Sequence, residues 1–155
     1  MAAAFSRETV AAALFSLVDT AVGNVVGLQT SSRVLRAPQN VTPEQCPALF
    51  QSQRGEEYEH TFGKMIKLPP KRTMLFEMWL YVSDAQEPNI VPSTQLNNMV
   101  GAIENALMPF AALDGPQTLG GLTVSARIDG KIEYAEAFTT DGKSVAVVPI
   151  AVLVP

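Results

Sequence analysis

The apolar pattern is densest at the C-terminal end of the chain. Residues 144–155 read SVAVVPIAVLVP, without a charged side chain. Because successive side chains of a β-strand point to opposite faces, this segment predicts a strand that is apolar on both. The even face is Ala146, Val148, Ile150, Val152 and Val154, and the odd face is Val145, Val147, Pro149, Ala151 and Leu153. One core cannot cover both faces, so we expect a second cover, for which a neighbouring copy of the chain is a strong candidate.

Residues 73–83 (TMLFEMWLYVS) predict the clearest internal strand. Its even positions are all apolar and mark the core side: Met74, Phe76, Met78, Leu80 and Val82. Its odd positions mix polar and aromatic groups, as protein interfaces do: Thr73, Leu75, Glu77, Trp79 and Tyr81. Leaving Trp79 and Tyr81 in water would forgo about 2 kcal/mol of burial free energy apiece. Either a second helix of the same chain or a partner surface could cover them, and the pattern does not decide between the two.

Two segments have helical periodicity. The first begins at Ser6 as N-cap and ends near Gly23, with an apolar stripe of Val10, Leu14, Leu17, Val18 and Ala21. The second begins at Ser93 as N-cap and ends before Pro109, with a stripe of Leu96, Met99, Val100, Ile103 and Leu107. Gly101 lies inside the second helix, where glycine costs about 1 kcal/mol relative to alanine, and this predicts close backbone packing there.

The apolar periodicity of the segments between these elements is weaker. We expect short strands at 31–36 and 48–53, with a proline-bearing loop at 37–47. Residues 54–72 are polar and predict a long irregular connection. Long connections in compact domains are usually functional or mobile.

Residues 122–138 permit two interpretations. Asp129-Gly130 is a hairpin signal, but the apolar even phase continues across it, which favours one long strand with Gly130 at a bend or a close backbone contact. We then expect the turn at 139–143 and pairing with the terminal strand in which Ile128 faces Val154 and Ile132 faces Ile150. Pro149 has no N–H, so its amide side should face an edge or a bulge.

Together these elements predict a single α+β domain over residues 1–155. The expected architecture is a mostly antiparallel sheet of about five strands, with two helices packed on one face.

Composition narrows the function classes. The net charge is -4 and the pI is about 4.9, which argues against a protein that grips nucleic acid by neutralising phosphates. The acidic balance is compatible with a protein that lets nucleic acid slide past its surface without holding the backbone. Cys46 is the only cysteine, so no disulfide framework is expected and a reducing compartment is the simplest interpretation. Residues 10–18 resemble a signal-peptide core, but Glu8 and Asp19 flank them and favour a core helix. No apolar run is long enough to span a membrane.

The sequence offers few candidates for chemistry. His60 is the only histidine, and a cation at Glu56, Glu57, Glu59 and His60 is less favoured than a solvated polar loop. A Cys46–His60 dyad is conceivable, but a structural thiol is the stronger interpretation. The basic stretch from Lys64 to Arg72 could contact DNA, although no aromatic platform accompanies it. We therefore expect neither an enzyme nor a metal or other cofactor.

The order of segments resembles the tail terminator proteins, also called tail-completion or head-to-tail joining proteins, of long-tailed bacteriophages. The resemblance is carried by CPALFQSQRGEEYE at 46–59, LPPKRTMLFEMWLYV at 68–82, VPSTQLNNMVGAIENALMP at 91–109, QTLGGLTVSARIDGKIEY at 117–134 and AVVPIAVLVP at 146–155. It implies a non-enzymatic virion protein, assembled in the host cytoplasm. It also implies a ring, commonly a hexamer, that caps the tail tube, joins it to the head-completion or connector proteins, and lets double-stranded DNA pass through its bore. Another neck or tail component, such as a stopper or a tube subunit, is the alternative.

A ring of identical subunits is a head-to-tail arrangement, so each subunit needs two different contact surfaces. The outer faces of the strands at 73–83 and 144–154 are candidates for one of them, together with the basic residues that precede the first strand. The candidate partner-binding residues are Leu75, Trp79, Tyr81, Val145, Val147, Leu153, Lys71 and Arg72.

Overall fold

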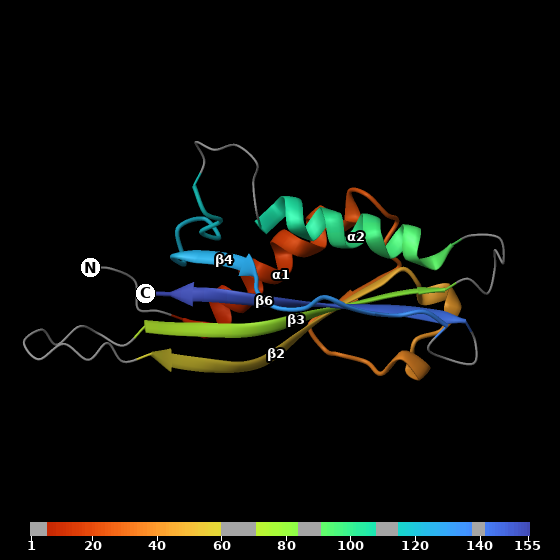
Figure 1. The fold of residues 1–155 in the computed structure, drawn as a ribbon, viewed down its shortest axis with the longest axis horizontal. Coiled ribbons are helices and arrows are strands. Elements are labelled where there is room, and N and C mark those ends of the chain that lie inside the picture. The colour runs from red at the N-terminus through yellow and green to blue at the C-terminus, as the bar shows by residue number, and fades with distance from the viewer. Residues whose placement is uncertain (1–5, 60–70, 84–90, 108–114, 138–141) are drawn as a thin grey trace, which may run out of the picture.

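The computed structural model describes residues 6–59, 71–83, 91–107, 115–137 and 142–155 (Figure 1). Two α-helices and six strands form an α+β fold, as the sequence predicts. The elements are α1 (Arg7–Gly23), β1 (Thr30–Ser32), β2 (Ala48–Glu59), β3 (Lys71–Ser83), α2 (Pro92–Leu107), β4 (Ser125–Ile128), β5 (Glu133–Ala135) and β6 (Lys143–Val154). Two short 3₁₀ turns, at Pro38–Asn40 and Pro43–Gln45, lie between β1 and β2.

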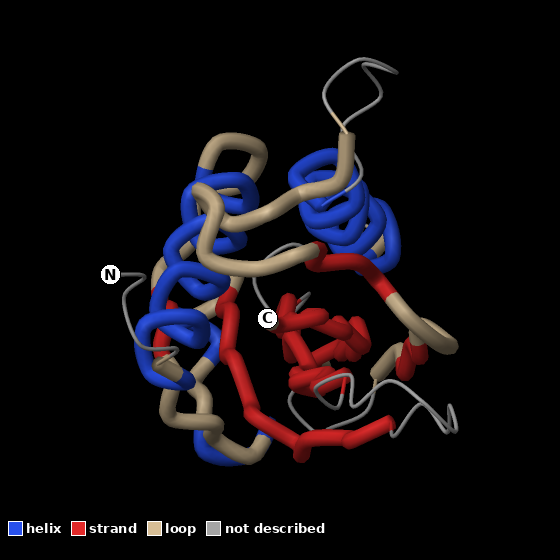
Figure 2. Tube along the Cα trace, turned by 90° about the vertical axis from the view of Figure 1, so that its left-hand side faces the viewer, coloured by secondary structure: helices blue, strands red, loops and turns tan. Residues whose placement is uncertain are grey.

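The strands form one sheet in the order β1-β2-β3-β6-β4, and β5 also pairs with β6. Every pair is antiparallel except β1 with β2. The two helices contact each other and lie beside the strands (Figure 2). We call the sheet face beneath the helices the inner face and the opposite one the outer face.

The inner face holds the main core. All five even positions predicted for the strand at 73–83 are buried there, together with the even positions of β6 from Ala146 to Val154. In α1 the Ser6 hydroxyl accepts from the Thr9 N–H, so the predicted N-cap is confirmed. The last buried residue of α1 is Val22, whereas the sequence predicted Ala21.

Two predictions for the second helix are wrong. The helix begins at Pro92, so Ser93 lies inside its first turn and is not the N-cap. Proline suits that first position because its missing N–H has no partner there in any helix. A Cβ added at Gly101 would meet no atom within 4 Å, so this glycine marks no close backbone approach.

The prediction of an irregular connection over residues 54–72 is also wrong, because both ends of that segment are β-strand. β2 continues to Glu59 and β3 begins at Lys71, and the two pair up to that point, with a bulge near Arg54. Antiparallel pairing satisfies the backbone whatever the side chains are, so a polar sequence can still be a strand. The strand expected at 31–36 is short for a related reason, since only Thr30–Ser32 pairs with β2. Residues 60–70 lie outside the described part of the chain.

β4 and β5 each pair with β6 and not with each other across Asp129-Gly130, so the preference over a hairpin is confirmed. The one long strand expected at 122–138 is instead these two short strands. The pairing is interrupted, however, and its register differs: Ile128 lies opposite Ile150, not Val154. Gly130 is the cause of both, because its φ is +118° and its Cα lies against Pro149, whose Cγ would be 3.4 Å from an added Cβ. The Pro149 carbonyl accepts from the Asp129 N–H. The side of Pro149 that lacks an N–H therefore faces this interruption, as predicted. The turn at 139–143 falls largely outside the described residues.

Candidate assembly surface

One end of the outer face is covered by the connection between β1 and β2. Val41 from this connection packs with Ala48, Phe50, Tyr81 and Val145 in a second, small core. The Phe50 and Tyr81 rings lie 5.4 Å apart at 48°, a tilted arrangement that aromatic pairs favour. We call this end the covered half. The sequence pattern left a helix or a partner as the cover for Tyr81, and the structure shows a third solution, a loop with two 3₁₀ turns.

Tyr81 fastens that connection to the sheet. Its hydroxyl donates to the Arg36 carbonyl oxygen at 2.6 Å, and its ring is fully buried. Burial raises the pKa of Tyr81 to about 12, and nearby Cys46 adds to the rise. The phenol therefore remains a neutral donor at physiological pH and holds residue 36 against β3.

The rest of the outer face is only partly covered. We call it the open half; its partly exposed residues are Leu75, Glu77, Trp79, Val147, Pro149 and Leu153. Glu77 is its charged member. The Trp79 Nε1 donates to one Glu77 oxygen at 3.1 Å, and the Arg54 Nε lies 3.4 Å from the other. These contacts fix the orientation of the indole, so the largest side chain of the open half is held in place within its own chain.

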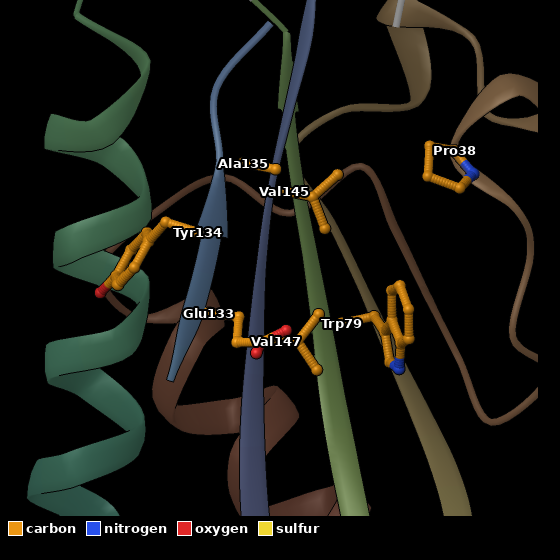
Figure 3. A pocket seen from close by; sticks show the side chains of 7 residues that line it. All are labelled: Pro38, Trp79, Glu133, Tyr134, Ala135, Val145 and Val147. Carbon is orange, nitrogen blue, oxygen red and sulfur yellow. The ribbon is translucent and has the colours of Figure 1, made fainter. Parts of the chain in front are cut away.

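A cavity of about 220 Å³ lies at the border of the two halves. Glu133, Val147 and Trp79 form a row across β5, β6 and β3, with Pro38 facing them from the connection, while Tyr134 points the other way (Figure 3). Ala135 and Val145 complete the lining. We call it the Trp79 cavity. Its walls are apolar except for the Glu133 carboxylate, which lies 4.0 Å from Lys131 Nζ.

The predicted contact residues fall into three places. Leu75, Trp79, Val147 and Leu153 lie on the open half. Tyr81 and Val145 are buried in the covered half, so their side chains support the surface from within.

Lys71 and Arg72 lie apart from these, at the far end of the β2–β3 hairpin. Lys71 pairs with Glu59 at 3.8 Å, and Arg72 donates to the Pro155 carbonyl at 2.6 Å. Both cations are thus engaged within their own chain.

Sequence reasoning missed Glu133, Ala135 and Pro38 as neighbours of Trp79. The reason is the register, since the predicted pairing set Ala135 opposite Val147, whereas the structure sets Glu133 there. The interruption at Gly130 causes this difference. The sequence signals for this register change were Asp129-Gly130 and Pro149. They indicate that the pairing with the terminal strand is interrupted, but not by how many residues the register shifts.

The structure does not support the metal site or the Cys46–His60 dyad that the sequence analysis considered. Within the ranges that the structure describes, no group of three or more His, Cys, Asp or Glu side chains could hold a metal ion. His60 lies outside those ranges, so a Cys46–His60 dyad is not placed. The acidic residues beside it, Glu56, Glu57 and Glu59, lie on β2, where Glu56 pairs with Arg7 and Glu59 pairs with Lys71. Cys46, the single cysteine of the sequence, is half-buried beside the covered half. None of the helices in the described ranges is long and apolar enough to cross a bilayer.

Comparisons with known proteins reveal a shared fold. No model of a known protein family matches the chain, and no curated protein does. A solved structure that carries no functional description matches with a TM-score of 0.53 at 15% identity, over 97% of this chain and 96% of that one. A chain from the virion of a native gene transfer agent particle matches with a TM-score of 0.49 at 14% identity, over 92% of each chain. The first match shows a shared α+β fold over the 97% of this chain that it covers; the second is too distant to carry an argument.

Proposed function

We propose that this protein is a structural virion component of a long-tailed phage, a tail terminator. In this proposal identical subunits form a ring, a hexamer in the commonest form. The ring caps the tail tube, joins it to the head or neck proteins and lets DNA pass through its bore. The resemblance of five sequence segments to that family suggests the role. The observation that carries the proposal is the open half of the outer face.

The open half has the composition of a protein contact surface. Its aliphatic side chains surround one tryptophan, and interfaces are enriched in aromatic residues at their centres. Tryptophan is also among the residues that contribute most to binding energy. The orientation of Trp79 is fixed by Glu77 before any partner arrives, and such preorganisation lowers the entropy cost of association. These features support a specific subunit contact.

The charge distribution agrees with a passage for DNA. Most basic side chains in the described ranges lie in ion pairs with acidic neighbours. Paired cations are poorly placed to neutralise phosphates, and phosphate neutralisation is what gives DNA binding its affinity and its salt dependence. We therefore expect the purified protein to bind duplex DNA weakly.

The test is native mass spectrometry and negative-stain imaging of the purified chain and of Trp79→Ala. We expect the wild type to form a closed ring, and Trp79→Ala to weaken association by at least about tenfold, as the loss of a central aromatic contact does. Tyr58→Ala is the matched control, because Tyr58 is an exposed aromatic on the β2–β3 hairpin outside the open half.

Two outcomes decide the proposal. A wild-type chain that remains monomeric at high concentration would contradict it. A ring that attaches to filled heads but never to the ends of tail tubes would instead indicate a neck component.

A further inference from the structure

A free cation lies close to the outer face. Arg36 is the one basic side chain in the described ranges for which neither an ion pair nor a hydrogen bond exists. It is exposed, and it follows two exposed aliphatic residues, Val34 (70% exposed) and Leu35 (37% exposed). The unpaired cation and these two aliphatic side chains are therefore all accessible to a partner.

The segment that carries these side chains is fastened at both ends. Arg33 pairs with Glu8 of α1. The Val34 N–H donates to the Ser32 hydroxyl at 3.0 Å, and the Arg36 carbonyl accepts from Tyr81. The backbone of residues 33–36 is therefore positioned while its side chains face outward. We call it the 33–36 segment.

The Trp79 cavity has the complementary chemistry. At about 220 Å³ it is smaller than the roughly 300 Å³ at which small-molecule sites begin, so it suits one side chain. An indole and a carboxylate line the same space (Figure 3). Aromatic faces and carboxylates both attract guanidinium groups, and the apolar walls suit the aliphatic stem of an arginine.

We propose that the Trp79 cavity receives Arg36 of a second copy of this chain, with Val34 and Leu35 of that copy packing on the open half. Arg36 makes no such contact within its own chain. The cavity and the 33–36 segment share no residue, and a contact between two different sets of residues is what the head-to-tail arrangement of a ring requires. This inference rests on the proposed ring and names the residues of its subunit contact.

The test is charge reversal, followed by native mass spectrometry over a dilution series. We expect Arg36→Glu and Glu133→Arg each to weaken association by at least about tenfold, because like charges then meet in a partly desolvated contact. The double variant Arg36→Glu/Glu133→Arg should recover most of the loss. Glu104→Arg is the matched control: Glu104 is exposed on α2, and this change alters the charge as Glu133→Arg does.

The thermal midpoint of the dissociated chain should not change in Arg36→Glu, because that side chain has no partner in its own chain. Separate results decide the inference and the proposed function. A wild-type ring that persists in Arg36→Glu, or single variants that dissociate without recovery in the double variant, would overturn the inference and leave the ring standing. A monomeric wild type would overturn both.

Discussion

The two faces of the sheet differ most clearly along β3, where neighbouring residues have opposite environments. Phe76 and Met78 point to the inner face and are buried under the helices. Leu75 and Trp79 point to the outer face and remain partly exposed, with the Glu77–Arg54 pair between them. The inner face is completed by its own chain, whereas the open half of the outer face is not. The even residues of β3 thus stabilise the subunit, whereas Leu75, Glu77 and Trp79 keep exposed surface, which we propose that a neighbour covers.

Replacing the adjacent residues Phe76 and Leu75 tests this division most directly. Phe76→Ala removes a fully buried ring from the inner core and should lower the free energy of unfolding by about 3–5 kcal/mol. Leu75→Ala removes a partly exposed side chain and should cost about 1 kcal/mol or less in the same measurement, yet weaken subunit association. Urea unfolding of the dissociated chains gives the first quantity, and analytical ultracentrifugation gives the second. Equal losses of unfolding free energy would show that the outer face is ordinary core.

The covered half should give an intermediate effect. Tyr81→Phe keeps the ring but leaves the Arg36 carbonyl without its 2.6 Å donor. Losing one partner of a buried hydrogen bond costs about 1–3 kcal/mol, so we expect the thermal midpoint to fall by several degrees. If the further inference holds, association should weaken as well, because the 33–36 segment loses an anchor. Phe50→Leu is a useful control, since it alters the same small core without touching this hydrogen bond. A Tyr81→Phe chain that matches the wild type in both measurements would show that Tyr81 does not anchor the connection.

The sequence predicted the periodic parts of this fold and missed what depends on distant pairing. The alternating pattern of β3 and β6 identifies the inner face residue by residue, because a buried face must be apolar. The helix stripes identify most of the buried positions but not all, since Val22 is buried in α1 where Ala21 was expected. Polar residues 54–59 gave no such signal. They form a strand because β3 lies beside them, which is information that no local pattern contains.

The candidate surface was predictable to a similar extent. The apolar odd face of β6 predicted a second cover, and the connection at 36–47 supplies it for one end of that face. That Tyr81 would be buried and Trp79 partly exposed could not be inferred, since both are aromatic residues on the same face. The placement of Glu133 beside Trp79 depends on the two-part pairing around Gly130, whose register follows from one glycine–proline contact.

The smallest expected effect concerns the ion pairs that fasten the start of α1 beside the sheet. Arg7 donates to Glu56 and to the Tyr58 hydroxyl, and Arg33 donates to Glu8. The hydrogen bonds from Arg7 lower the pKa of Glu56, and those from Arg33 lower the pKa of Glu8. A carboxyl whose pKa is lower in the folded state stabilises the fold above its unfolded pKa, near 4.5, and this stabilisation is lost as the pH falls through the folded value.

The stability of the dissociated chain should therefore decline below about pH 4.5, by a small amount because these pairs are exposed and screened by solvent. Glu56→Gln should flatten that decline, as followed by thermal unfolding between neutral and acidic pH. Glu57→Gln is the matched control, because its neighbour Glu57 is exposed and makes no ion pair. An identical decline in all three proteins would show that the Arg7–Glu56 pair does not hold α1 to the sheet in solution. If the decline flattens while ring formation at neutral pH is unchanged, the attachment of the helix and the subunit contact on the outer face are energetically separate.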